Sequence, residues 1–193
     1  MDKITKMGLF AVFGGFMMTV VAYGHPLAPA QRERAALYQS LGTARSITEG
    51  QGSRTLYVFF DANCPYCHLL FSRLKRFGGP YRVTVHEILV GYVTPTSIGK
   101  AAALLESHNP PAALMYAETH YSWTKGSDIA PILPNAATRR ALVENMKLDK
   151  QVAGFTIVPV MVYKQANGII RIRNIGMPPV WKLKKILASI KKD

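Results

Sequence analysis

The sequence contains few cysteines and few acidic residues. Its 193 residues include 2 cysteines, 11 Asp or Glu and 24 Lys or Arg, which give a formal net charge of +13. The two cysteines are Cys64 and Cys67, and a disulfide between them would close too small a loop to stabilise a fold. A disulfide-reinforced scaffold is therefore excluded. Hydrophobic residues make up 49% and charged residues only 18%, which excludes a disordered chain and predicts a folded core.

The N-terminal apolar run is too short for a typical membrane span, which needs roughly 20 residues. It follows two lysines, occupies residues 7–22 and ends in small residues near Gly24. This pattern is typical of a secretory signal peptide, so we expect residues 1–24 to be cleaved and the rest of the chain to be exported. An uncleaved membrane anchor is the alternative.

The excess of basic side chains bears on partners. A basic surface attracts acidic proteins, anionic lipid or nucleic acid. Nucleic acid is not expected as a partner of an exported protein, and a solubilising charge is the simplest interpretation.

Hydrophobic periodicity predicts an α/β fold. Strands are expected over residues 55–60, 81–91, 158–163 and 169–176. Helices are expected over residues 31–41, 65–77, 97–108, 110–121, 136–148 and 179–191, with a further short one over 149–153. The first strand–helix–strand unit requires a parallel pair with a right-handed crossover. We therefore expect a leader with a short helix over residues 25–52, and an α/β domain over 53–193 that carries a helical insertion at about 97–153.

The motif "CPYCH" has two interpretations. Cys64, Cys67 and His68 fit the attachment pattern of a c-type haem, and they also fit a dithiol redox motif. A β-strand leads directly into Cys64 and a helix follows it, which favours the dithiol. The remaining histidines complete no four-ligand zinc spacing, so neither a metal nor another cofactor is expected.

The position of the cysteines predicts their roles. Cys64 opens a helix, where unpaired N–H groups and the helix dipole favour a thiolate. Cys64 should therefore attack, and the more buried Cys67 should resolve the mixed disulfide. Pro65 fits the first helical turn, and we expect Tyr66 to shape the surface that docks substrate.

Three further positions, Pro159, Asp61 and His68, have two interpretations each. A cis bond between Val158 and Pro159 would expose a backbone edge that binds an extended substrate, although Pro159 also suits the first residue of a strand. Asp61 either caps the helix or moves protons. His68 either assists proton transfer or is a bystander on the first helical turn. The aromatic cluster of the insertion (Tyr116, Tyr121 and Trp123) is expected to pack in the core.

Several segments resemble the thioredoxin-fold domains of the periplasmic disulfide isomerases DsbC and DsbG, and DsbG most closely. They are "FFDANCPYCH", "EILVGYVTPTS", "AAALLES", "VPVMVY" and "NIGMPP". The resemblance implies a thioredoxin-like fold, a periplasmic location, cysteine-containing exported proteins as substrates and a membrane reductase of the DsbD kind as electron donor. It also implies a nucleophilic Cys64, a resolving Cys67 and a cis Pro159.

The sequence departs from that family in two ways. Residues 25–52 are too few for the dimerisation domain that precedes the redox domain in the isomerases, so a monomer is expected. Val158 replaces the threonine of the isomerases and resembles the oxidase DsbA. A thiol oxidase and a chaperone-like peptide-binding module therefore stand as alternatives to a disulfide reductase or isomerase.

Overall fold

The computed structural model describes residues 29–174 and 176–193 of the chain. Its helices are α1 (Pro29–Leu41), α2 (Pro65–Phe77), the 3-10 turn η1 (Gly79–Tyr81), α3 (Ser97–Leu105), α4 (Pro110–Thr119), α5 (Ala136–Ala153) and α6 (Val180–Ser189). Its strands are β1 (Ser46–Glu49), β2 (Arg54–Phe60), β3 (Val83–Leu89), β4 (Val160–Lys164) and β5 (Ile170–Arg173). The signal-peptide prediction falls on residues outside these ranges.

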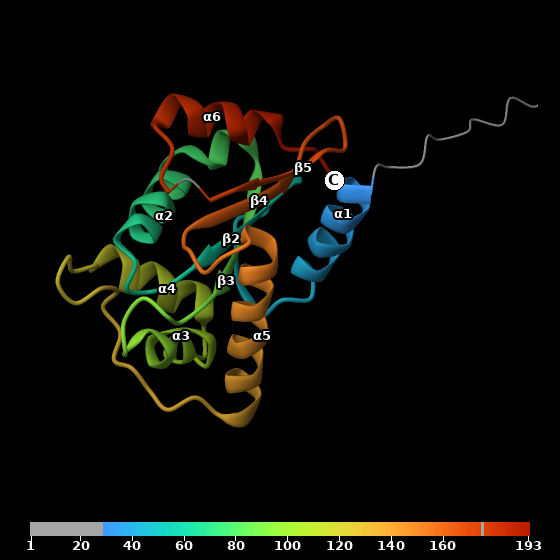
Figure 1. The fold of residues 1–193 in the computed structure, drawn as a ribbon. Coiled ribbons are helices and arrows are strands. Elements are labelled where there is room, and N and C mark those ends of the chain that lie inside the picture. The colour runs from blue at the N-terminus through green and yellow to red at the C-terminus, as the bar shows by residue number, and fades with distance from the viewer. Residues whose placement is uncertain (1–28, 175) are drawn as a thin grey trace, which may run out of the picture.

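The strands form one sheet in the order β1-β3-β2-β4-β5 (Figure 1). Strands β2 and β3 are parallel, as the predicted crossover requires, and the other neighbouring strands are antiparallel. The central strand β2 is rich in aromatic and β-branched residues, which suits burial on both faces. Phe59 pairs with Val160, so the end of β2 lies beside the start of β4.

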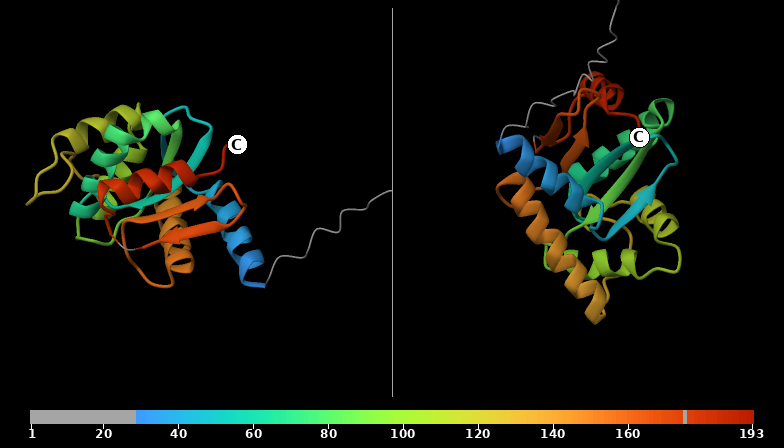
Figure 2. Two further views of the ribbon diagram at one scale, coloured as in Figure 1. Left: turned by 90° about the horizontal axis from the view of Figure 1, so that it is seen from above. Right: turned by 90° about the vertical axis from the view of Figure 1, so that its right-hand side faces the viewer.

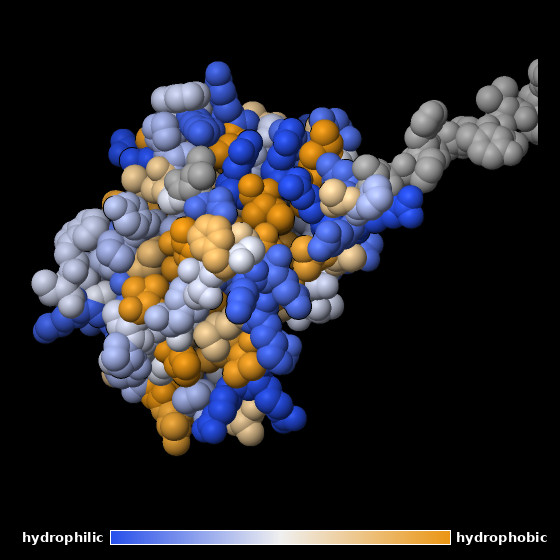
Figure 3. Space-filling view, in the orientation of Figure 1, coloured by the Kyte–Doolittle hydropathy of each residue, from blue (hydrophilic) through white to orange (hydrophobic). Residues whose placement is uncertain are grey.

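Alternate residues of β2 pack against different helices. Leu56 and Val58 lie on the side of the sheet that α2 and α6 cover. They pack there in one cluster with the fully buried Leu70 of α2 and Leu187 of α6. The intervening β2 residues face the opposite side, where they pack with residues of α1 and α5. Figure 2 shows α1 and α5 lying together on that side. The result is a sheet between two helical layers, with hydrophilic outer faces on α5 and α6 (Figure 3).

The structure corrects two sequence predictions. Strand β1 lies in the segment interpreted as a polar leader, and it pairs antiparallel with β3 at the edge of the sheet. Its four residues are too few and too polar to show a strand pattern in sequence. The helix predicted over residues 149–153 is the last part of α5, which continues without a break to Ala153. The insertion thus consists of α3, α4 and α5.

None of the helices in the described ranges has the length and apolar character needed to cross a bilayer.

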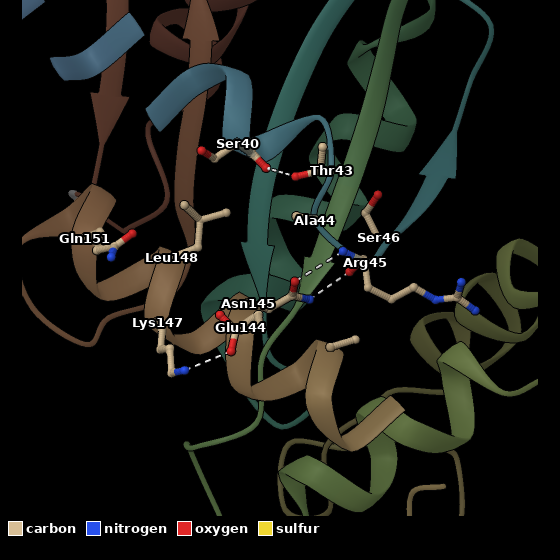
Figure 4. A pocket seen from close by; sticks show the side chains of 11 residues that line it. Ser40, Thr43, Ala44, Arg45, Ser46, Glu144, Asn145, Lys147, Leu148 and Gln151 are labelled. Carbon is tan, nitrogen blue, oxygen red and sulfur yellow. Dashed lines mark hydrogen bonds and ion pairs between the residues drawn. The ribbon is translucent and has the colours of Figure 1, made fainter. Parts of the chain in front are cut away.

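Asn145 ties α5 to the sheet. Its side-chain amide donates to the carbonyls of Arg45 (2.7 Å) and Leu89 (2.8 Å) and accepts from the Arg45 N–H (3.2 Å). It forms the floor of a cavity of about 830 Å³ between α1, β1 and α5 (Figure 4). Asn145 is 2% exposed and its bond to the Leu89 carbonyl is buried, so loss of the amide leaves that carbonyl without this partner.

We expect Asn145→Ala to lower the free energy of unfolding by about 2 kcal/mol, since it removes three hydrogen bonds, one of them buried. Denaturant unfolding monitored by circular dichroism measures this. The matched control is Glu144→Ala, which removes only an exposed ion pair with Lys147 and should cost less than about 0.5 kcal/mol. Equal losses in the two variants would contradict this role of Asn145.

Burial raises the pKa of Asp149 from 3.8 to about 6, although Tyr92 donates a 2.6 Å hydrogen bond to its carboxyl. A carboxyl whose pKa is higher in the folded protein stabilises it at low pH and loses that contribution as the pH rises. Between about pH 4 and 6.5 we expect the stability of the natural protein to fall by about 2 kcal/mol relative to that of Asp149→Asn. Unfolding curves of both proteins across this range measure the difference, and parallel pH profiles would contradict it.

Candidate redox site

The two cysteines lie at the junction of β2 and α2, where the sequence places them. Cys64 is the N-cap of α2, with extended backbone angles, and Pro65 is the first helical residue. The backbone N–H of Cys67 donates to the Cys64 sulfur at 3.3 Å. The sulfur therefore takes the place that a capping oxygen normally occupies, and it satisfies one of the free N–H groups of the first turn.

The surroundings of Cys64 favour its thiolate. A hydrogen bond from the Cys67 thiol makes the largest contribution to lowering its pKa, and the N–H groups of Cys67 and Tyr66 add to it. Burial and the charge of Asp61 act in the opposite direction without reversing the shift. Cys64 can thus supply a nucleophilic sulfur near neutral pH.

Cys67 has the opposite character. It is 1% exposed, and burial raises its pKa well above the ordinary value, with its hydrogen bond to Cys64 and the charge of that sulfur adding to the effect. Cys67 therefore stays a thiol while Cys64 is ionised. This asymmetry is what an attacking and a resolving cysteine require.

The segment before β4 meets the cysteines from the other side. The Val158–Pro159 peptide bond is cis, as the sequence analysis expected. The Val158 carbonyl accepts a long hydrogen bond from the Cys64 thiol, with 3.8 Å between sulfur and oxygen. Pro159 is buried, and Tyr66 is 59% exposed. The structure thus brings together Cys64, Cys67, Tyr66, Val158 and Pro159.

Asp61 does not cap α2, which was one of its two interpretations, because Cys64 occupies that position. The Asp61 carboxylate is fully buried and accepts hydrogen bonds from four groups. They are the N–H groups of Asn63 (2.9 Å), Tyr92 (2.9 Å) and Val93 (3.0 Å) and the hydroxyl of Ser97 (2.8 Å). Its contacts therefore fix the loop that leads into Cys64 to the segments that follow β3.

His68 makes specific contacts with the insertion. Its Nδ1 lies 3.0 Å from Oε2 of Glu118, and its ring stacks on Tyr121 with 4.1 Å between centroids. Glu118 is 2% exposed, and burial raises its pKa although hydrogen bonds from Ser127 and His68 oppose the shift. His68 is therefore not a bystander on the first turn. The sequence pattern could not indicate this contact, because Glu118 is 50 residues away along the chain.

The sequence analysis expected the aromatic residues of the insertion to pack in the core, and this prediction is wrong for two of them. Tyr116 is 58% exposed and Trp123 is 65% exposed. Trp123 contacts the edges of the rings of His68 and Tyr121, and the Tyr121 hydroxyl lies 3.4 Å from the Asn63 carbonyl. The loop after α4 therefore forms part of the surface beside Cys64.

Sequence reasoning missed Asn63, which precedes the nucleophile. Its amide donates to the hydroxyls of Thr94 (2.7 Å), Thr96 (3.0 Å) and Ser97 (3.1 Å). The only signal in the sequence is the hydroxyl-rich run "TPTS" after the second predicted strand. In the described ranges, no group of three or more His, Cys, Asp or Glu side chains could hold a metal ion.

We expect Cys67→Ala to raise the pKa of Cys64, because the substitution removes the hydrogen bond that lowers it most. Thiolate absorbance and the rate of iodoacetamide alkylation, both followed against pH, measure the change. The control is Cys64→Ala, in which the remaining Cys67 should react only at much higher pH. An unchanged or lower pKa of Cys64 in Cys67→Ala would show that Cys67 does not stabilise the thiolate.

Comparison with known proteins gives consistent results. A family model described as a thioredoxin-like domain matches residues 41–191. The thiol:disulfide interchange protein DsbG of Pseudomonas aeruginosa is 31% identical over 164 residues, which are 83% of this chain and 60% of that protein. DsbG of Escherichia coli K12 is 26% identical over 164 residues, which are 84% of this chain and 63% of that protein. The chain thus spans about 60% of the length of these relatives.

Solved structures share the fold. A disulfide interchange protein from Neisseria gonorrhoeae is 23% identical with a TM-score of 0.57, covering 77% of this chain and 97% of that one. The catalytic domain of Proteus mirabilis ScsC is 20% identical with a TM-score of 0.62, covering 82% of this chain and 96% of the other. Because the family match includes the sheet, the dithiol helix and the insertion, the chain belongs to the thioredoxin-like domain family.

Proposed function

We propose that this chain is an exported thiol–disulfide oxidoreductase that reduces or isomerises disulfides of other exported proteins, as a relative of DsbG. The observation that carries the proposal is the opposite shift of the two cysteine pKa values: that of Cys64 is lowered and that of Cys67 is raised. The names of the DsbG relatives support the same reaction class.

The reaction follows from this asymmetry. The Cys64 thiolate attacks one sulfur of a substrate disulfide, which forms a mixed disulfide and releases the other substrate sulfur as a thiolate. Cys67 then loses its proton and attacks the Cys64 sulfur. The substrate leaves as a dithiol, and the protein is left with a Cys64–Cys67 disulfide. In isomerisation, a second substrate thiol attacks the mixed disulfide instead, so no net oxidation occurs.

The surroundings of the sulfur suggest how substrate binds. Tyr66 and Pro65 present one wall of the site, and the backbone at Val158 and Pro159 presents the other. An extended substrate segment would bind along Val158 and Pro159. We assign Asp61 to positioning the Cys64 loop rather than to proton transfer, because protein groups already donate four hydrogen bonds to it. His68 and Glu118 form the nearby pair that can hold a proton.

The complete cycle requires partners. Reduction of the Cys64–Cys67 disulfide requires an electron donor, for which we propose a membrane reductase of the DsbD kind. We further propose that the chain acts in the periplasm as a monomer, after cleavage of residues 1–24. Val158 favours a second candidate, a DsbA-like oxidase, in which the same steps run in reverse and the disulfide is donated to substrate.

The first test is reduction of insulin, with and without the cysteines. We expect Cys64→Ala to abolish turnover, because no attacking sulfur remains, and Cys67→Ala to accumulate a mixed disulfide that reductant releases. Non-reducing electrophoresis and mass spectrometry identify the trapped species. Retained turnover in Cys64→Ala would refute the proposal. A chaperone-like module would instead protect a substrate from aggregation equally well with and without Cys64.

The direction of electron flow has its own measurement. Acid trapping and alkylation of the exported protein in cells report the state of Cys64 and Cys67. We expect mostly reduced cysteines if the chain is a reductase or isomerase. Mostly oxidised cysteines would overturn that assignment in favour of the oxidase.

A further inference from the structure

A buried lysine lies beside the redox site. Lys100 of α3 is 6% exposed, and its ammonium donates to the backbone carbonyls of Lys125 and, at 2.8 Å, Ser127. An ammonium has three donors, and these carbonyls use two of them. The loop that carries both carbonyls is joined to the segment before Cys64 by a 2.8 Å hydrogen bond from the Ser127 N–H to the Ala62 carbonyl.

The charge of Lys100 has no carboxylate partner in the part of the chain that the structure describes. The ion pairs found there join other residues, and no carboxylate oxygen lies within 4.0 Å of the Lys100 ammonium. Burial lowers the pKa of Lys100. The more distant charges of Asp128, Glu118 and Asp61 raise it without reversing the shift. Buried charges in proteins are normally paired, so this ammonium is suited to binding an anion.

Lys100 lines a cavity of about 780 Å³ that reaches the residue before the nucleophile. Asn63 and the loop between α4 and α5 form its walls, and the exposed Trp123 contributes an apolar side. Thr94 and Thr96 also line it. Both accept hydrogen bonds from the Asn63 amide, and their hydroxyl oxygens lie 3.1 Å apart, so one hydroxyl hydrogen joins the two residues and the other is available as a donor. The cavity therefore combines two lysines, Lys100 and Lys125, with the carboxylate of Asp128 and neutral donors.

These features favour a singly charged anion. The side chains that line the cavity carry two positive charges (Lys100 and Lys125) and one negative charge (Asp128), so a dianion such as phosphate would exceed their net charge of +1. A carboxylate needs only one positive charge and a few donors. Asn63 both lines the cavity and directly precedes Cys64. The cavity therefore lies beside the loop that carries the attacking sulfur.

We propose that this cavity is a subsite for a carboxylate that the substrate carries within a few residues of its reacting cysteine. The inference rests on the proposed thiol–disulfide exchange and adds a substrate class to it, namely cysteines flanked by Asp or Glu. An extended chain advances roughly 3.3 to 3.6 Å per residue, so an acidic side chain one to three residues from the cysteine is within reach. The apolar body of that segment would contact Trp123.

The test compares peptide disulfides that differ only in Glu or Gln near the cysteine. With the natural protein we expect the Glu peptide to be reduced about tenfold faster in kcat/KM, because a charge-assisted hydrogen bond of this kind contributes about 1.5 to 3 kcal/mol. Lys100→Met should remove this preference, so that the Glu and Gln peptides are reduced at equal rates. The matched control, Lys150→Met, removes an exposed lysine of α5 and should keep the preference.

A second variant keeps the test decisive if Lys100→Met does not fold. Thr124 is exposed on the wall of the cavity, and Thr124→Asp adds a negative charge there without burying it. It should also abolish the preference for Glu. If the preference survives in Thr124→Asp and in any folded Lys100→Met, or if the natural protein has none, the proposal is wrong.

Binding can also be measured without turnover. Trp123 and Trp181 are the two tryptophans, so Trp181→Phe makes Trp123 the only one. In a Trp181→Phe/Cys64→Ala protein we expect the Trp123 fluorescence to change with the Glu peptide at concentrations at least about fivefold lower than with the Gln peptide. This difference can appear even if the protein turns over no disulfide, which separates the subsite from the proposed function. Equal titrations of the two peptides would overturn the subsite.

The same measurements separate two sources of the carboxylate. Glutathione is a small peptide thiol that carries carboxylates, so its disulfide serves as a further substrate. A Lys100-dependent rate for glutathione disulfide together with Glu and Gln peptides of equal rate would overturn the assignment to polypeptide segments. A Lys100-dependent rate for the Glu peptide supports it.

Discussion

The redox site depends on a buried carboxylate that is not itself reactive. Asp61 accepts hydrogen bonds from its own loop, from two N–H groups that follow β3 and from a hydroxyl at the start of α3. Removing any of these donors would leave a buried charge under-solvated, so the segments are held as a unit. The position of Cys64 at the first turn of α2 follows from that unit. The same charge slightly opposes the thiolate, and the N–H groups of the helix outweigh it.

The chemistry and the recognition surface come from different parts of the chain. The dithiol and the cis Val158–Pro159 bond lie at adjacent ends of β2 and β4, where strand pairing alone brings them together. The helical insertion contributes Glu118, Tyr121 and Trp123, and it contacts the dithiol helix through His68. The sheet thus sets the reactivity of the sulfurs, while the insertion shapes the space beside them.

Much of the fold and the centre of the site could be predicted from the sequence, because each depends on local patterns. The β2–α2 junction shows a buried strand, a helix period and the cysteines together. Strand β1 could not be predicted, since only its pairing with β3 makes a strand of four residues whose one apolar member is Ile47. The role of Asp61 was also out of reach. A helix cap is a local contact, whereas its partners at residues 92, 93 and 97 become neighbours only when β3 pairs with β2.

Gly126 limits how this architecture can vary. Its φ of +77° lies in the left-handed region, and a Cβ there would come within 2.1 Å of Asn63 Oδ1 and 3.0 Å of the Ala62 carbonyl. The backbone of the insertion therefore touches the backbone of the catalytic loop at a point where no other residue fits. Its neighbours Thr124 and Lys125 are exposed and have no such limit. The exposed residues before this glycine can therefore change during evolution without disturbing the contact that keeps them in register with the sulfur, whereas Ser127 on its other side is buried and hydrogen-bonded to Ala62.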